Sequence, residues 1–128
     1  MSDKKIVVSL VTPEETIFED EADSIVVPAI SGALGILPGH IPIVVRLAIG
    51  IVKINSGDKA RYFGIQRGNL EFIFNKANIL TERAVETSYE DRDKVVEKLK
   101  EKYDILQEVT EETKRVARAV AGLKDLKK

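Results

Sequence analysis

The chain lacks cysteine altogether, and its 128 residues include a single histidine, His40. The absence of cysteine excludes disulfides, thiolate metal sites and a cysteine nucleophile. With one histidine as well, a typical zinc site is not expected. A catalytic triad would need His40 beside a serine and an acid, and its proline–glycine surroundings form no nucleophile elbow. We therefore predict a protein that is not catalytic by itself and requires no cofactor.

Long apolar runs are also missing. No stretch approaches the roughly 20 apolar residues that are needed to span a bilayer. The apolar run within residues 1–11 is too short for a signal peptide, and it reads as a first strand. We therefore expect no direct membrane insertion, and a chain that reaches a membrane only through partners.

Neither sign of charge dominates, because 20 basic and 21 acidic residues leave a formal net charge of −1. Such a chain has no overall field that would attract nucleic acid or a lipid surface. The acidic run at residues 19–23 lacks the spacing of a calcium-binding loop and is expected to be a solvated turn. Neither a nucleic-acid partner nor a bound metal is predicted.

Residues 1–86 contain short runs rich in Val, Ile, Phe and Tyr, separated by turn residues. All four prolines and every glycine except Gly122 lie in this part. Strands at this spacing, with no helical segment between them, predict an antiparallel β-sandwich or barrel. The clearest hairpin surrounds residues 55–58. The predicted strands are Ile6–Val11, Ser24–Pro28, Ile43–Leu47, Ile51–Ile54, Arg61–Ile65, Leu70–Phe74 and Ala77–Thr81.

The pattern changes to helical spacing at residues 87–128, which we expect to form a second unit. Ser88, with Asp91 three positions on, predicts a helix N-cap. A second helix is predicted from Thr110, and the two should form an antiparallel hairpin. Neither helix is long enough to be stable alone, so the hairpin must rest on the sandwich or on another protein. The predicted class is α+β, and the apolar stripe of the first helix is Val95, Val96, Leu99, Tyr103 and Leu106.

Four pieces of the sequence matter together because of the order in which they occur. They are VTPE at 11–14 with ADSIVVP at 22–28, GALGILPGHIP at 32–42, LAIGIVKI at 47–54, and GNLEF at 68–72 with NILT at 78–81. The second is similar to the pattern G-x-x-G-I-L-P-x-H-x-P. Together the pieces resemble the epsilon subunits of bacterial-type F-type ATP synthases, the counterpart of the mitochondrial delta subunit. The resemblance covers essentially the whole chain and implies a sandwich of about ten strands followed by a two-helix hairpin.

The resemblance also implies a role. Epsilon subunits belong to the central stalk, where they hold the gamma subunit and rest on the ring of membrane c subunits. They transmit rotation between proton flow and the catalytic alpha and beta subunits, and in many bacteria their C-terminal helices inhibit ATP hydrolysis. The implied location is the cytoplasmic side of the bacterial plasma membrane, as a peripheral part of the ATP synthase.

The resemblance implies that the loop at residues 32–42, which we call the family loop, contacts the c-ring. The matching residues are Gly35, Pro38, Gly39, His40 and Pro42. Glycines and prolines predict an exposed, shaped turn with His40 at its tip. The alternative is a packed turn in which His40 bonds a backbone carbonyl. Many relatives have an acid where this chain has Ala33, so an ionic contact from that position is not expected.

The basic end of the chain implies the inhibitory contact to the catalytic subunits. Between residues 109 and 128, six basic residues stand against three acidic ones. The alternative is that these bases only complement the dipole of the second helix. The residues proposed for the contact are Lys114, Arg115, Arg118 and Lys124.

Some bacterial relatives bind regulatory ATP through an [IL]-D-x-x-R-A motif on the first helix and arginines on the second. Here the stretch reads EDRDKV at 90–95, so Asp91 matches, while Lys94 replaces the arginine. Lysine keeps the charge but loses the fork geometry suited to phosphate. The candidate ATP-binding residues are Asp91, Lys94, Arg115 and Arg118. A competing interpretation of the whole chain is a generic β-sandwich module that binds a protein or a small ligand.

Overall fold

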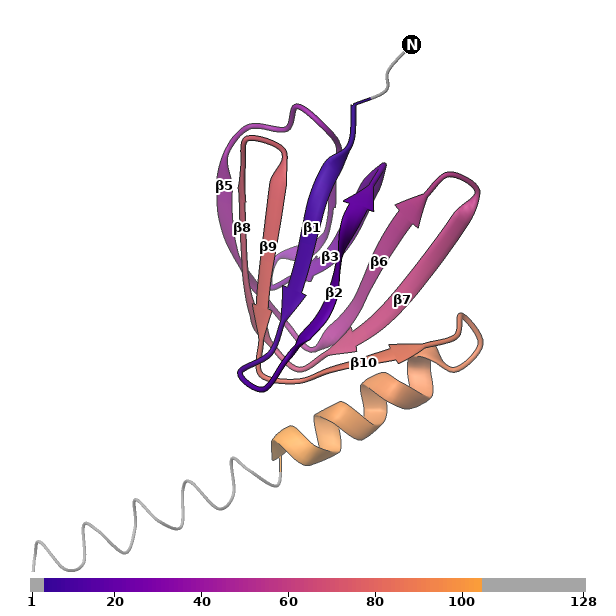
Figure 1. The fold of residues 1–128 in the computed structure, drawn as a ribbon. Coiled ribbons are helices and arrows are strands. Elements are labelled where there is room, and N and C mark those ends of the chain that lie inside the picture. The colour runs from indigo at the N-terminus through magenta and orange to yellow at the C-terminus, as the bar shows by residue number, and fades with distance from the viewer. Residues whose placement is uncertain (1–3, 105–128) are drawn as a thin grey trace, which may run out of the picture.

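Ten β-strands and one helix make up the part of the chain that the computed structural model describes, residues 4–104 (Figure 1). The helix covers residues 92–104 of the described part. The strands are β1 (Ile6–Val11), β2 (Thr16–Ala22), β3 (Ser24–Ala29), β4 (Gly32–Ile36), β5 (Ile43–Leu47), β6 (Gly50–Ser56), β7 (Lys59–Ile65), β8 (Gly68–Ile73), β9 (Lys76–Thr81) and β10 (Ala84–Thr87).

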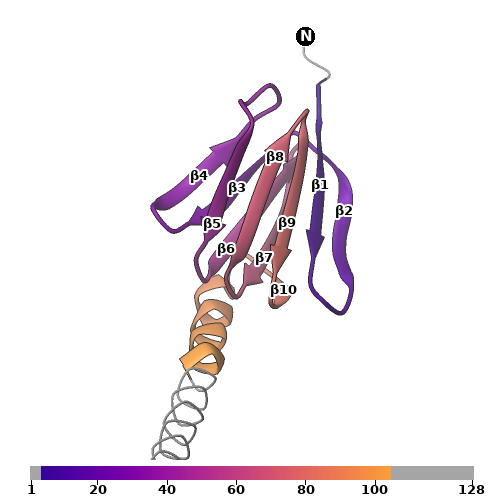
Figure 2. The same cartoon turned by 90° about the vertical axis from the view of Figure 1, so that its left-hand side faces the viewer.

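The ten strands form one sheet in the order β10-β7-β6-β3-β5-β8-β9-β1-β2, with β4 attached to β3. The sheet curls over so that its β2 end meets β7, where the rings of Phe18 and Phe63 pack edge to face with centroids 5.7 Å apart. Figures 1 and 2 show the resulting two layers. Within residues 4–104, the strand pairings are antiparallel except that of β1 with β9, which is parallel.

Side chains alternate between the core and the outside, as the period of a strand requires. β9 follows this pattern strictly, with Ala77, Ile79 and Thr81 buried and the residues between them exposed. The inward side chains from both layers form one apolar core whose largest members are Phe63 and Phe72. The outward side chains of the same strands are therefore free to serve other contacts.

β3 forms the corner between the two layers. Its first half pairs with β6, and its last residue, Ala29, pairs with Leu47 of β5. Pro28 lies at this change of partner, where its missing N–H is not needed by a ladder. A Cβ on Gly50 would lie 2.7 Å from the Cβ of Pro28, so this position has room only for glycine.

Charged side chains tie together the end of the sandwich that lies away from the helix. Asp23, between β2 and β3, accepts hydrogen bonds from the Nζ of Lys5 and from the backbone N–H of Gly57. The bond from Lys5 is the main reason why the pKa of Asp23 lies below its usual value, and the Gly57 N–H adds to it. Three segments distant in sequence meet at this one carboxylate.

The helix is held against the sandwich on one face. Ser88 caps it, since its Oγ accepts the N–H of Asp91 at 3.3 Å, as predicted. Leu99 is buried, and its carbonyl accepts a hydrogen bond at 3.2 Å from Nε2 of Gln66, which is also buried. Arg67 donates to the hydroxyl of Tyr103 and lies over its ring, 5.1 Å from the centroid.

The predicted strands are all present, and Ile6–Val11 and Ile43–Leu47 have the predicted bounds. Three strands had not been predicted from the residues alone: β2, β4 and β10. The acidic run at 19–23 was expected to be a turn, which is wrong, because residues 19–22 belong to β2 with their acids exposed at the edge of the sheet. The second helix of the predicted hairpin and the remainder of the stripe at Leu106 lie outside the described residues.

Gly64→Ala should release the helix without unfolding the sandwich. A Cβ at this position would lie 2.5 Å from Cγ1 of Val95 and 3.1 Å from Cδ1 of Leu99. Overpacking of this kind costs about 1–3 kcal/mol, and moving the helix relieves it. Hydrogen exchange should show faster exchange at residues 95–103 and unchanged protection in β8 and β9. The control is Gly35→Ala, where an added Cβ meets nothing within 4 Å; equal protection of the helix in both variants would contradict the prediction.

Asp23→Asn should reduce the loss of stability in acid. Since the folded-state pKa of Asp23 is lowered, its stabilising effect is present above the unfolded value of about 3.9 and is lost as the pH falls through the folded value. Melting temperatures of the wild-type chain and the variant should therefore differ at pH 6 and converge as the pH falls below the folded-state pKa. A constant difference across this range would show that the carboxylate contributes nothing through its charge.

Candidate functional site

The family loop covers fewer residues than the predicted segment 32–42. Residues 32–36 form β4, with Gly35 paired to Val26, so the expectation of a turn over the whole segment is wrong for its first half. The loop proper covers residues 37–42. Of the predicted contact residues, Pro38, Gly39, His40 and Pro42 lie in this loop, and Gly35 lies exposed in the adjoining strand.

The loop begins with a tight turn. The N–H of His40 donates to the carbonyl of Leu37 at 3.1 Å. Gly39 has a φ of +88°, and with Pro38 before it this is the arrangement of a type II turn. Glycine is needed here because a side chain would be strained in this conformation. The predicted rigid turn is thus present at residues 37–40.

Two contacts fasten the loop to the β8–β9 hairpin. The N–H of Gly39 donates to Oδ1 of Asn75 at 2.7 Å. The ring of His40 packs edge to face against the buried Phe72, with centroids 5.9 Å apart, and its Nδ1 lies 2.7 Å from the carbonyl oxygen of Ile41. His40 is therefore half-buried and anchors the loop, instead of standing at its tip. The exposed large hydrophobic side chains of the loop are Leu37 and Ile41.

The outer face of β1, β9, β8 and β5 forms a shallow groove of about 560 Å³. Two large apolar side chains point outward into solvent here: Val44 is 72% exposed and Leu80 is 58% exposed. Glu71 is the one charged residue among those that line the groove. The other lining residues are Ser9, Val11, Asn69, Leu70, Asn78 and Ile79.

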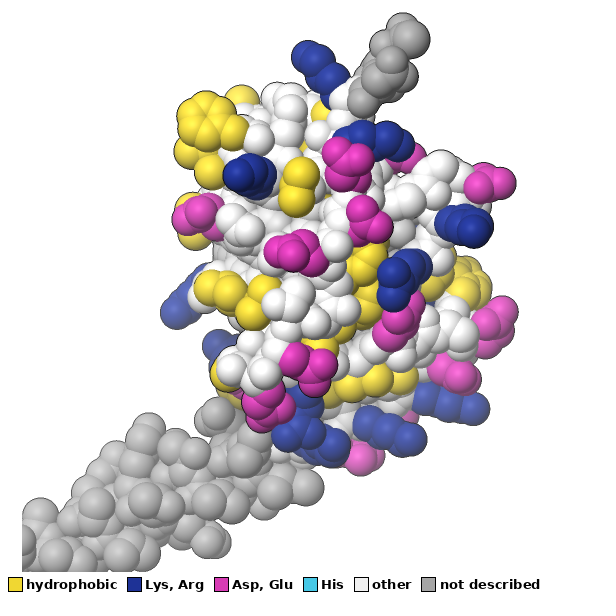
Figure 3. Space-filling model, viewed as in Figure 1, with side chains coloured by type: hydrophobic (Ala, Val, Ile, Leu, Met, Phe, Trp, Pro, Cys, Tyr) yellow, Lys and Arg dark blue, Asp and Glu magenta, His cyan; other side chains and the backbone are white. Residues whose placement is uncertain are grey.

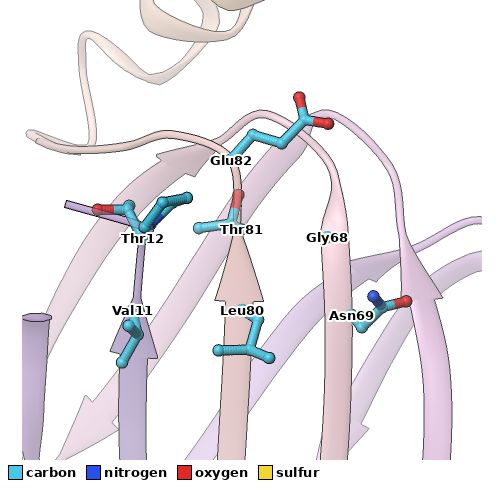
Figure 4. A pocket seen from close by; sticks show the side chains of 8 residues that line it. Val11, Thr12, Gly68, Asn69, Leu80, Thr81 and Glu82 are labelled. Carbon is cyan, nitrogen blue, oxygen red and sulfur yellow. The ribbon is translucent and has the colours of Figure 1, made fainter. Parts of the chain in front are cut away.

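The groove continues toward the helix end of the sandwich. Figure 4 shows Val11, Leu80 and Asn69 side by side on β1, β9 and β8, below Thr12, Thr81 and Glu82. The space-filling view shows hydrophobic, acidic and basic side chains interspersed over this side of the molecule (Figure 3). With 32% of the chain charged, a groove whose nine lining residues include one charged side chain is a distinct surface, although Arg46 and Lys76 are exposed on the same strands. We call it the strand groove.

The first turn of the helix carries the described part of the predicted nucleotide site. Asp91 and Lys94 are both exposed. Beside them, the guanidinium of Arg92 lies 3.7 Å from the ring centroid of Tyr89, which packs edge to face on Tyr62. Arg115 and Arg118 lie outside the described residues, as do Lys114 and Lys124, so regulatory ATP and the inhibitory contact stay predictions.

The strand groove had not been identified from the sequence. Its signal was present, since Val44 and Leu80 are apolar residues at positions that alternate out of phase with the core. Without the register, however, the sequence did not show that these two side chains share a face. Among residues 4–104, no helix is both long and apolar enough to cross a membrane.

The comparisons with known proteins agree with this structure. Residues 5–87 match the family model described as ATP synthase, Delta/Epsilon chain, beta-sandwich domain. The ATP synthase epsilon chain of Leptospira interrogans (serovar copenhageni) is 40% identical over 98 residues, which cover 77% of this chain and 76% of that one. That of Bacillus cereus (strain B4264) is 38% identical over 88 residues, covering 69% and 66%.

Solved structures show the same fold. A chain of the Euglena gracilis mitochondrial ATP synthase, from a structure of OSCP, F1 and the c-ring, aligns with a TM-score of 0.62 at 25% identity, over 77% of this chain and 68% of that one. A chain of the Tetrahymena thermophila mitochondrial ATP synthase central stalk and c-ring aligns with a TM-score of 0.56 at 17% identity, over 66% and 69%.

The resemblance drawn from the motifs is confirmed, and the interpretation as an unrelated β-sandwich module is set aside. The family model covers the whole β-sandwich, and the matches span 76% of the Leptospira chain and 66% of the Bacillus chain. This chain belongs to the delta/epsilon chain family of ATP synthases, as a non-catalytic subunit of the complex.

Proposed function

We propose that this chain couples proton translocation to ATP synthesis as a subunit of the central stalk, by holding the gamma subunit with one surface and the c-ring with another. The observation that carries the proposal is the strand groove, which exposes Val44 and Leu80 and has one charged residue in its lining, on a chain that is otherwise heavily charged. The Euglena relative, at 25% identity, comes from a structure that contains F1 and the c-ring, which supports the choice of the ring as a partner.

The strand groove is the proposed site of the gamma subunit. Val11 of β1 lies opposite Leu80 of β9, so these two apolar side chains lie side by side, and Asn69 of β8 lies opposite Leu80 on its other side. Burying a side chain of this size contributes about 1.5–3 kcal/mol. The small polar residues Ser9 and Asn78 leave the groove open to a close approach by a helix or strand of the partner.

The loop at 37–42 is the proposed site of the c-ring. It lies at the end of the sandwich away from the helix, so the two ends of the domain are available to different partners (Figures 1 and 2). Its conformation is fixed by the turn at Gly39 and by the packing of His40, which lowers the entropy cost of binding. The chain would thus be peripheral to the membrane, on the cytoplasmic side.

The segment from residue 88 onward is the proposed regulatory part. In this structure the first helix rests on the sandwich through Gln66, Arg67 and Leu99. The contact with the catalytic alpha and beta subunits is assigned to the basic residues Lys114, Arg115, Arg118 and Lys124, which would meet acidic segments and be weakened by salt. The proposed effect is to restrain ATP hydrolysis.

Val44→Glu and Leu80→Glu should each weaken binding to the gamma subunit by at least about tenfold, or ~1.4 kcal/mol. A carboxylate in the contact would be desolvated, while the free chain should lose no more than about 0.5 kcal/mol, since both sites are exposed. Titration of purified gamma with each variant measures the effect. Ala60→Glu, exposed on β7, is the control. Unchanged affinity in both groove variants would overturn the assignment of gamma to this face.

Ending the chain after Thr87 should leave the complex assembled and raise its ATPase activity. The groove and the loop are both kept, while the proposed inhibitory segment is removed. Replacing Lys114, Arg115, Arg118 and Lys124 together by glutamine should reproduce the increase if charge is responsible. ATPase activity of the purified complex is the measurement, and equal rates for the truncated and full chains would refute the inhibitory role.

A further inference from the structure

The β8–β9 turn contains a phenylalanine, Phe74, in a backbone conformation that is unfavourable for a bulky side chain. Ile73 pairs with Lys76, so the turn consists of Phe74 and Asn75, with φ values of 51° and 57°. Two left-handed residues make this a type I′ turn, which favours asparagine and glycine. A bulky side chain in that conformation is strained, and Phe74 is also 87% exposed. Such strain gathers at functional sites.

Asn75 suits the same conformation and joins the turn to its neighbours. Its Oδ1 accepts the N–H of Gly39 at 2.7 Å, and its backbone carbonyl accepts the N–H of Val7 at 2.8 Å. The turn and the loop at 37–42 are therefore fastened together at the residue next to Phe74. A partner that approaches the loop meets the turn as well.

Three large apolar side chains stand out from these two segments. Leu37 is 64% exposed, Ile41 is 72% exposed and Phe74 is 87% exposed. Figure 3 shows hydrophobic side chains gathered at the upper left, over the end where β5 and β8 meet the loops in Figure 1. No residue from 36 to 43 is charged. We call Leu37, Ile41 and Phe74 the tip surface.

We propose that the β8–β9 turn is the second half of the surface that docks on the c-ring, with Phe74 as a contact residue and Asn75 as a positioning residue for the loop. This inference rests on the proposed function, in which the loop at 37–42 meets the ring. The hydrogen bond between Gly39 and Asn75 makes the turn continuous with that loop, so both meet the same occupant. Burial of the Phe74 side chain against the c subunits would offset the strain of a phenylalanine at this left-handed position.

Phe74→Asn tests the contact, because it should change stability and binding in opposite directions. Asparagine relieves the left-handed strain, so the melting temperature of the full chain should rise or stay equal. The variant is then assembled with the gamma subunit and titrated with detergent-solubilised c-ring. Its affinity for the ring should be about tenfold lower than that of the wild-type chain. A residue with a merely structural role would lower both. The control Val85→Asn, at a 45% exposed position on β10, should leave the affinity unchanged.

Asn75 is tested by a pair of variants. Asn75→Ala removes the acceptor of the Gly39 N–H and should weaken ring binding, while Asn75→Asp keeps the acceptor and should restore it. Equal affinity of the two variants would overturn the positioning role.

Ile41→Asn distinguishes a failure of the inference about the β8–β9 turn from a failure of the proposed loop contact with the c-ring. If Ile41→Asn weakens ring binding and Phe74→Asn does not, the inference about the turn is wrong and the loop contact stands. If neither variant changes the affinity, the proposed ring contact falls with it.

Discussion

β1 pairs in parallel with β9, and both candidate surfaces depend on this pairing. It connects strands about 70 positions apart in the chain, with Val7 opposite Lys76 and Val11 opposite Leu80. At one end it brings the N–H of Val7 to the carbonyl of Asn75 and so steadies the turn that holds the loop. At the other end it sets Val11 beside Leu80 and completes the strand groove. Without it, the β1–β2 hairpin would have no hydrogen-bonded neighbour in the sheet.

The two faces of the same strands have different tasks. Inward residues such as Leu70, Phe72 and Ile79 are fully buried and hold the layers together. Outward residues such as Val44 and Leu80 add nothing to that core, yet they are apolar. Isolated apolar residues on a surface need no explanation, but Val11, Leu80 and Val44 in one groove whose lining has a single charge indicate an interface. The division lets a small domain bind on its flank without loss of its core.

The strands and the capped helix could be predicted because they depend on local pattern: alternation within 76–81, and Ser88 before Asp91. β2 and β4 could not, since their exposed acids and glycines suggest turns, and only pairing with β1 and β3 makes them extended. The loop was identified by its motif, but the role of His40 was not, because its contact with Phe72 joins residues 32 positions apart. The same holds for the strand groove, which needs the register of four strands.

Site-specific cross-linking within the assembled ATP synthase tests the central claim most directly. The chain has no cysteine, so one introduced at Leu80 or at Phe74 is its only thiol. The account predicts that Leu80→Cys cross-links to the gamma subunit and Phe74→Cys to a c subunit. Cross-linking of both positions to the same partner, or of either one to the catalytic subunits instead, would contradict the assignment of two docking surfaces.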